Sequence, residues 1–378
     1  MIIHILILTS LSITIFAQQN PITSLKYSLQ NTAVNYIPCE DSYQCNFEPF
    51  PLEYKPQQHP HNPTILETFI LRIPHGKVYS HDGVIIEKNH ILKDLLWPTN
   101  ALRRSELEKL DVQALPQAKK VIGKVAVIAQ NGQFCYYHWM TEVLGRLLLL
   151  ESHNIEYDYL VVPVSKSYMR ESLELFGIDF NKIIEPDEEY NYIEADELIV
   201  PSLVNQVYPS PSLSSYPSLK VINVVRNRFL PKIETLPKNS WSKKIFISRK
   251  DAAFRKLINE DELFEKLKNE GFQRYCLSDL SLLEQIALFN HADIIIALHG
   301  AGLANLIFSK PETQVIELFQ ARADATYWYM SQTLHLHHTC IQTCEFDQKE
   351  KDVGFFDTTI SQDAIDRILT IVQSLKDL

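Results

Sequence analysis

The sequence predicts an α/β protein with two domains, each built on a sheet of parallel strands. The chain has 378 residues, more than a single hydrophobic core usually serves. From Lys124 onward, short apolar segments alternate with segments of helical periodicity, which is typical of parallel sheets. An apolar strand at 293–298 leads directly into a turn with two glycines and then a helix, as in doubly wound domains.

The composition is that of a soluble globular protein, and the charge argues against a nucleic-acid binder. Hydrophobic residues make up 46% of the chain and charged residues 22%, so large cores can form. The net charge of −10 and the pI of about 5.7 exclude the dense basic face of nucleic-acid-binding proteins. A site for phosphate groups must therefore be a local cluster of donors and cations.

An apolar segment occupies residues 1–17 and ends at Ala17. Its length is that of a secretory signal peptide and falls short of the ~20 residues of a membrane span. Because the segment carries no Lys or Arg, a retained membrane anchor and a buried strand are the alternatives. We expect the chain to enter the secretory pathway and to act in the ER or Golgi lumen or outside the cell, with membrane contact only if the segment is retained.

An even number of cysteines also suits an oxidising compartment. The six are Cys39, Cys45, Cys135, Cys276, Cys340 and Cys344. Cys39 with Cys45, and Cys340 with Cys344, could close small loops, but spacing alone leaves the pairing open.

Composition and periodicity divide the rest of the chain. Residues 18–75 are rich in Pro, Asn, Gln and Tyr, so an irregular arm is expected there. The N-terminal α/β domain is expected at 76–230, a Pro-containing linker at 231–242 and the C-terminal domain at 243–350. A final helix within 351–378 is expected to pack back on the N-terminal domain.

The elements follow from periodicity and from helix start and stop signals. In the N-terminal domain we expect strands at 125–129, 159–164 and 197–201, and helices at 136–151, 167–176 and 219–229. In the C-terminal domain we expect strands at 244–248, 272–277, 293–298 and 313–318. Capping boxes predict helices that begin after Asn259, with Glu262, and after Ser281, with Glu284.

The turn after 293–298 is the strongest candidate for a ligand site. Gly300 and Gly302 permit close approach of a ligand to the backbone, and the following helix offers its N–H groups to a phosphate. His299 adds a donor at the same place. A tight turn without function is the alternative, but the carboxyl end of a parallel strand is where such sheets bind ligands.

A polar stripe marks the otherwise apolar helix at 136–151. His138, Glu142 and Arg146 are four residues apart, so they share one face. They either line a cleft or form a structural ion-pair ladder. His138 and Glu142 could also supply two metal ligands, but no third ligand stands out.

Two further positions could serve a nucleotide. Arg249 and Arg255 follow the strand at 244–248, and arginine suits bidentate contact with phosphate. Glu317, at the end of the strand at 313–318, could accept hydrogen bonds from ribose hydroxyls or form a salt bridge at the strand end.

Several segments, in the same order, resemble glycosyltransferase family 61. They span 136–147, 247–263, 284–289, 299–308 and 315–318. The resemblance covers roughly residues 124–320. It implies a GT-B-like fold, in which two Rossmann-like domains face a cleft, with an inverting mechanism and a UDP-sugar donor. Members add N-acetylglucosamine to EGF repeats or to O-mannosyl glycans, or decorate plant xylan, so the sugar is expected to be N-acetylglucosamine or a pentose.

The resemblance also assigns roles. The diphosphate would be held by Arg249, Arg255, His299, Gly300, Ala301, Gly302 and Asn305, and the ribose by Glu317. His138 or Glu142 would face the acceptor across the cleft. We expect His138 to be the base, with Glu142 orienting or replacing it, and Trp139 and Arg146 to lie on the acceptor side. The chain departs from the family at Gly145, where relatives often carry proline.

The expected reaction is a one-step displacement at the anomeric carbon, in which cations and a helix end stabilise the departing UDP. The chain has no Asp-x-Asp motif, so we expect neither a metal nor another cofactor to be required. The partners are a UDP-sugar and a glycan or glycoprotein. The alternatives are an inactive relative that binds a sugar or nucleotide, and a nucleotide-dependent oxidoreductase, against which Asn305 in place of a third glycine speaks.

Overall fold

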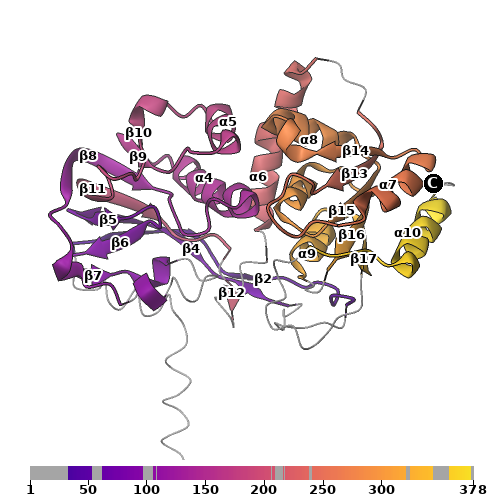
Figure 1. Cartoon of the computed structure of the whole chain (residues 1–378). Helices are drawn as coiled ribbons and strands as arrows, with labels where there is room; N and C mark the ends of the chain where they lie inside the picture. Colours follow the sequence, from indigo (N-terminus) through magenta and orange to yellow (C-terminus); the bar gives the residue numbers. More distant parts are fainter. Residues whose placement is uncertain are drawn as a thin grey trace, which may run out of the picture.

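The computed structural model describes residues 33–52, 62–96, 105–107, 109–205, 207–208, 216, 218–237, 241–320, 324–343 and 357–375. The predicted signal peptide or anchor at 1–17 lies outside these residues, as does Cys344. Among the described residues, no helix has both the length and the hydrophobicity needed to cross a membrane. The chain forms two lobes, and helix α6 (Leu219–Phe229) lies between them (Figure 1). The fold is α/β in both lobes, as predicted.

The sheet of the N-terminal lobe is mixed. Its parallel part runs β10-β9-β8-β11 and comprises Ile183–Ile184, Tyr159–Val161, Lys119–Val127 and Tyr192–Pro201. Strands β4 (Thr68–Pro74) and β5 (Lys77–Tyr79) pair antiparallel with the other edge of β11, and β1 (Asn35–Glu40) pairs with β4. The outer strands β6 (Val84–Glu87) and β7 (His90–Ile91) complete this sheet.

The prediction of an irregular arm at 18–75 is therefore wrong for much of its described part. Residues 68–71 of β4 are buried because they pack within the sheet. The surrounding prolines and polar residues hid this β-branched and aromatic segment. Beyond β1, short strands β2 (Tyr43–Gln44), β3 (Thr64–Ile65) and β12 (Val207–Tyr208) form a separate small sheet. Cys39 and Cys45 are unbonded thiols, so this possible loop closure is absent.

The helices of the N-terminal lobe are close to those predicted, with one difference. The segment predicted as a single helix at 136–151 comprises α3 (Tyr136–His138), a π-helical turn η3 (Trp139–Val143) and α4 (Leu144–Ser152). Helix α5 (Ser167–Leu175) follows β9. Short 3-10 turns occur at Lys93–Leu95, Val112–Ala114 and Phe180–Lys182. A π-turn inside a helix often accompanies a functional site.

The C-terminal lobe is a five-stranded parallel sheet in the order β14-β13-β15-β16-β17. The strands are Gln273–Cys276, Lys244–Ser248, Ile294–Leu298, Gln314–Phe319 and His337–Gln342. The chain forms β13 first, then places β14 on one side of it and β15 on the other. The direction in which strands are added therefore reverses between β13 and β15. In this fold, ligands bind at the carboxyl ends of the strands at such a reversal.

Helices cover both faces of this sheet. On one face lie α8 (Leu282–His291), the 3-10 helix η7 (Ala301–Phe308) and α9 (Thr326–Thr333). On the other lie α7 (Glu260–Asn269) and α10 (Gln362–Ser374). The 3-10 turns η5 (Leu230–Thr235), which overlaps the predicted linker, and η6 (Leu277–Asp279) connect elements.

The final helix does not pack on the N-terminal domain, contrary to the prediction. In Figure 1, α10 lies beside α7 at the outer side of the C-terminal lobe. Its apolar stripe, Ile365, Ile368 and Val372, is fully buried against this face of the sheet. The apolar stripe of α10 needs an apolar surface to pack on, and the sheet face beside α7 needs a second helix to cover it.

One of the two predicted capping boxes forms. Ser281 and Glu284 cap each other's backbone groups at the start of α8. Asn259 makes no side-chain cap, because its amide bonds the backbone of Ile360 in both directions, at 2.9 and 3.1 Å.

Candidate functional site

A small pocket lies at the reversal point of the C-terminal sheet. It encloses about 170 Å³ at the ends of β13 and β15. Its apolar wall includes Ile247, Leu277 and Leu303, and its polar rim includes Ser248, Arg249 and Asp251. Gly300 and Gly302 also line it, so the predicted glycine turn and one predicted arginine meet in one cavity. An apolar pocket with a few polar groups is typical of a small-molecule site.

Arg249 lies directly against the glycine turn. A Cβ atom added to Gly300 would be 1.9 Å from Arg249 Nη1, so only glycine leaves room for this guanidinium. Arg249 also donates to the carbonyls of Phe254 and Arg255, at 3.3 and 3.2 Å. Burial, and then the nearby charge of Arg255, lower the pKa of Arg249 below its ordinary value. Two cations held together in this way favour an anion beside them.

A histidine with a buried carboxylate follows the same strand. His299 Nδ1 is 2.7 Å from Glu317 Oε1, and Glu317 is fully buried. The second oxygen of Glu317 is 3.0 Å from His338 Nε2. Burial raises the pKa of Glu317, but hydrogen bonds from both histidines outweigh it and hold the pKa below its ordinary value. Both carboxylate oxygens are thus engaged by protein, so the expected contact of Glu317 with a ribose is not supported by the structure.

A second pair of the same kind comes from the N-terminal lobe. His138 Nδ1 is 2.9 Å from Glu142 Oε1, and the two side chains are 16% and 4% exposed. Gln130, at the carboxyl end of β8, donates from Nε2 to the other oxygen of Glu142 at 2.6 Å. A buried carboxylate that holds one ring nitrogen of a partly exposed histidine is the arrangement that orients a general base. The π-helical turn of η3 contains Glu142.

The two lobes bring these groups to one interface. The Tyr136 hydroxyl donates to Asn305 Oδ1 at 2.7 Å. The Tyr137 ring stacks edge-on against Tyr327 at 5.7 Å, and Tyr327 lies 5.4 Å from the His299 ring. The His138 ring lies 5.2 Å from that of Tyr137, so the rings of Tyr137 and Tyr327 connect His138 to His299.

Two further residues predicted for the diphosphate site, Asn305 and Ala301, lie in the turn and helix η7. Asn305 is fully buried, and its amide donates to Gln285 Oε1 and to the carbonyl of Gly302, both at 3.1 Å. It is thus expected to shape the turn rather than contact a ligand. Ala301 is the partly exposed first residue of η7.

The acceptor-side predictions also fall on buried side chains. Arg146 is 2% exposed and donates to the carbonyls of Ala129, at 2.7 Å, and Pro201, at 2.8 and 3.1 Å. It joins the ends of two neighbouring parallel strands, so it contributes to neither a cleft nor a side-chain ladder. Trp139 is fully buried, and its indole N–H donates to Ser172 Oγ at 2.8 Å.

Several residues of these hydrogen-bonded and aromatic groups were not predicted from the sequence. Gln130, Tyr327, Ser331 and His338 were not singled out, because their roles arise from contacts across the fold. Tyr136 begins the segment 136–147 that resembles the family, but its bond to Asn305 arises only in the folded chain. A signal for His338 existed, since the chain from His335 to His338 contains three histidines.

One group of described residues has the spacing of a metal site. Ligand atoms of Glu317, His338 and Cys340 lie within 4.8 Å of one another. The Glu317 oxygens and both His338 nitrogens already have hydrogen-bond partners, including Ser331 Oγ at 2.7 Å from His338 Nδ1.

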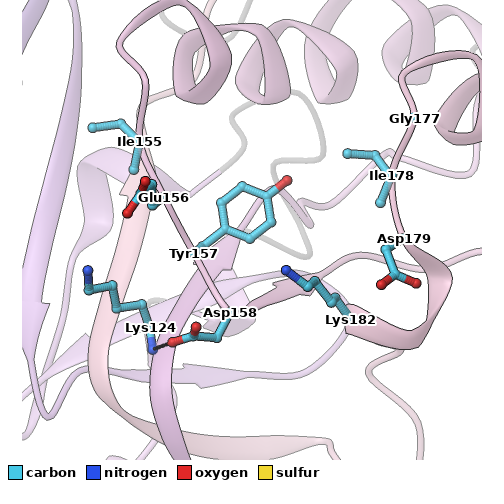
Figure 2. Close-up of a pocket in the computed structure, with 9 residues that line it drawn as sticks. All are labelled: Lys124, Ile155, Glu156, Tyr157, Asp158, Gly177, Ile178, Asp179 and Lys182. Atoms are coloured by element: carbon cyan, nitrogen blue, oxygen red, sulfur yellow. Dashed lines mark hydrogen bonds between the residues drawn. The ribbon is translucent and has the colours of Figure 1, made fainter.

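A larger hollow of about 530 Å³ lies elsewhere on the N-terminal lobe. Figure 2 shows Tyr157 and Lys182 pointing into it, between the segment before β9 and the segment after α5. Asp158 is occupied with the backbone N–H of Lys124 at 2.8 Å. No residue predicted for the site lines this hollow.

Comparisons with known proteins bear on the segment that forms the interface. Residues 136–316 match the family model described as Glycosyltransferase 61. EGF domain-specific O-linked N-acetylglucosamine transferases from Mus musculus, Drosophila melanogaster and Xenopus laevis are 28%, 33% and 34% identical over 100, 85 and 89 residues. These matches cover 25%, 22% and 22% of this chain and 19%, 16% and 17% of the relatives, so the chain matches less than a fifth of their length. The matches confirm the resemblance found in the sequence: residues 136–316 are similar to glycosyltransferase family 61.

Proposed function

We propose that this chain is a glycosyltransferase, which moves a sugar from a nucleoside diphosphate to a hydroxyl group. The observation that carries the proposal is the pocket at the reversal point, where Arg249 lies on Gly300. Its apolar wall suits a nucleobase, and Arg249, Arg255 and the N–H groups of residues 300–302 suit a diphosphate. The family match of the surrounding segment supports this assignment.

The relatives suggest the first donor and acceptor to test. Their name specifies transfer of N-acetylglucosamine to EGF domains, so we propose UDP-N-acetylglucosamine as donor and a glycoprotein hydroxyl as acceptor. A UDP-pentose with a glycan acceptor is the second choice. The apolar segment 1–17 supports action in the secretory pathway.

The chemistry would be a direct displacement with inversion. Glu142 holds Nδ1 of His138, so the opposite nitrogen, Nε2, would take the proton from the acceptor hydroxyl. The acceptor oxygen forms a bond to the anomeric carbon while the bond between that carbon and the phosphate oxygen breaks. The electron pair of the broken bond leaves with the UDP. Arg249, Arg255 and the turn after β15 would stabilise that charge, so the proposal requires no metal.

Matched variants of the full chain test this proposal. We expect His138→Asn to lower kcat by about 100-fold or more while the Kd for UDP changes less than about twofold. Arg249→Met should weaken UDP binding by about 30-fold, which corresponds to roughly 2 kcal/mol. His153→Asn, at the end of α4, and Arg170→Met, on the exposed side of α5, are the controls. Transfer from UDP-N-acetylglucosamine to an EGF domain would be measured with and without EDTA.

The rivals give different results. An inactive relative would bind UDP but transfer no sugar from any donor of a UDP-sugar panel. An oxidoreductase would be stabilised against heat by NAD and not by UDP. Loss of folding in His138→Asn, seen by circular dichroism, would show that the His138–Glu142 pair is structural.

A further inference from the structure

Glu317 is the centre of a line of four hydrogen-bonded side chains, Ser331, His338, Glu317 and His299. The successive distances are 2.7, 3.0 and 2.7 Å. Ser331 belongs to α9, His338 to β17, Glu317 to β16, and His299 follows β15. The line therefore crosses three neighbouring strands of the sheet and ends beside the glycine turn.

An ionised carboxylate can only accept hydrogen bonds, so it determines where its partners carry hydrogen. The hydrogen bonds from both histidines favour the ionised form of Glu317, which is fully buried. His299 must then carry hydrogen on Nδ1, and His338 on Nε2. The Ser331 hydroxyl can donate to the remaining nitrogen of a neutral His338. One carboxylate thus fixes a hydrogen on Nδ1 of His299 and on Nε2 of His338.

Exposure singles out His299 as the end that can meet a ligand. Its side chain is 20% exposed, whereas those of His338 and Glu317 are 2% and 0% exposed. The His299 ring is stacked on Phe319 at 5.3 Å and lies against Tyr327 at 5.4 Å. Its orientation is therefore determined by packing on the rings and by the bond to Glu317.

We propose that Glu317, His338 and Ser331 are positioning residues that hold His299 so that its Nε2–H donates to the leaving phosphate oxygen of the sugar nucleotide. Because Nδ1–H is bonded to Glu317, His299 donates from Nε2 when this second ring nitrogen also carries hydrogen, and the carboxylate then lies beside the positive charge of the ring. This inference rests on the proposed function, because the phosphate belongs to the proposed donor. It gives Glu317 a different role from the ribose contact that the sequence suggested.

The tautomers can be read directly by 15N NMR of the histidine rings in the chain without ligand. We expect hydrogen on Nδ1 of His299 and on Nε2 of His338 in the unmodified chain. Glu317→Gln offers one acceptor and one donor in place of two acceptors, so one histidine must change its tautomer. The control is Glu312→Gln, because Glu312 pairs with exposed His337 at 2.7 Å near the start of the same strand.

Kinetics then test the consequence for the reaction. We expect Glu317→Gln to lower kcat by about 100-fold, as for loss of a donor to a developing anion, while the KM for the donor changes less than about tenfold. Ser331→Ala removes no charge and should lower kcat by about fivefold, the effect of one hydrogen bond, whereas Ser331→Thr should retain activity. Glu312→Gln should leave both kcat and the His299 tautomer unchanged.

Three results would overturn the inference. One is hydrogen on Nε2 and not on Nδ1 of His299 in the unmodified chain, and another is unchanged kcat in both Glu317→Gln and Ser331→Ala. The third is a metal bound at one equivalent in the purified chain and lost in His338→Gln. Failure of the unmodified chain to bind UDP would count against the proposed function, and the tautomers, read without ligand, would still decide the arrangement of the four side chains.

Discussion

Replacing Gly300 with alanine tests whether Arg249 must lie against the turn. The added Cβ would be 1.9 Å from Arg249 Nη1 and 2.9 Å from Cζ, so the guanidinium must move. The φ angle of Gly300 is 168°, an extended value that alanine adopts without strain. The effect of the substitution is therefore confined to the space that the guanidinium occupies.

The expected cost falls on ligand binding. A displaced Arg249 loses its hydrogen bonds to the carbonyls of Phe254 and Arg255 and its place beside the pocket. A hydrogen bond to a charged group is worth about 2 kcal/mol, so the Kd for UDP should rise about 30-fold. Isothermal calorimetry with UDP measures this change.

Two further variants sharpen the test. In Gly302→Ala the new Cβ meets only the end of the flexible Leu277 side chain, at 2.7 Å, so UDP binding should weaken far less. In an Arg249→Ala background, Gly300→Ala should have little additional effect, because the clash has been removed. Binding of UDP by Gly300→Ala as tightly as by the unmodified chain, or an equal loss with and without Arg249, would refute this reasoning.

Three other predictions concern the buried polar groups. Arg146→Lys should lower the free energy of unfolding in urea by about 2–3 kcal/mol, because lysine cannot donate to the carbonyls at both strand ends. A loss below about 0.5 kcal/mol would show that Arg146 has no structural role. Tyr136→Phe should cost about 1 kcal/mol, and adding it to Asn305→Ala should cost nothing further, since both remove the same bond between the lobes. The pKa of Glu317 is lowered by folding, so the stability it contributes is complete above its ordinary pKa of 4.5 and is lost as the pH falls through the folded value. Thermal midpoints should accordingly decline below about pH 4.5 less steeply in Glu317→Gln than in the unmodified chain.

The fold class and the C-terminal lobe could be predicted because local signals agree with the tertiary structure there. Strand β15 is apolar throughout, the Ser281–Glu284 capping box forms, and glycines mark the turn. The N-terminal sheet could be predicted only in part. Strands β1 and β4 form because they pair antiparallel with each other and β4 pairs with β11, which is distant in the chain. Local composition does not predict such pairing.

The candidate site divides in the same way. Arg249 and Gly300 line one pocket, and His138 pairs with Glu142, because these residues lie at or next to elements with a clear sequence signal. The roles of the other polar residues depend on how deeply the fold buries their side chains. Arginine and glutamate are common in ligand sites, but Arg146 and Glu317 are both buried. Spacing identifies a shared helix face, not whether that face meets solvent or strand ends.

The central claim is that a sugar nucleotide binds at the reversal point of the C-terminal sheet. A crystal structure of the full chain with UDP tests it most directly. We expect the diphosphate to lie against Arg249 and the N–H groups of residues 300–302, with the base in the apolar pocket beside Leu277 and Leu303. UDP in the hollow around Lys124 and Lys182, or a reversal-point pocket that stays empty at saturating UDP, would contradict it.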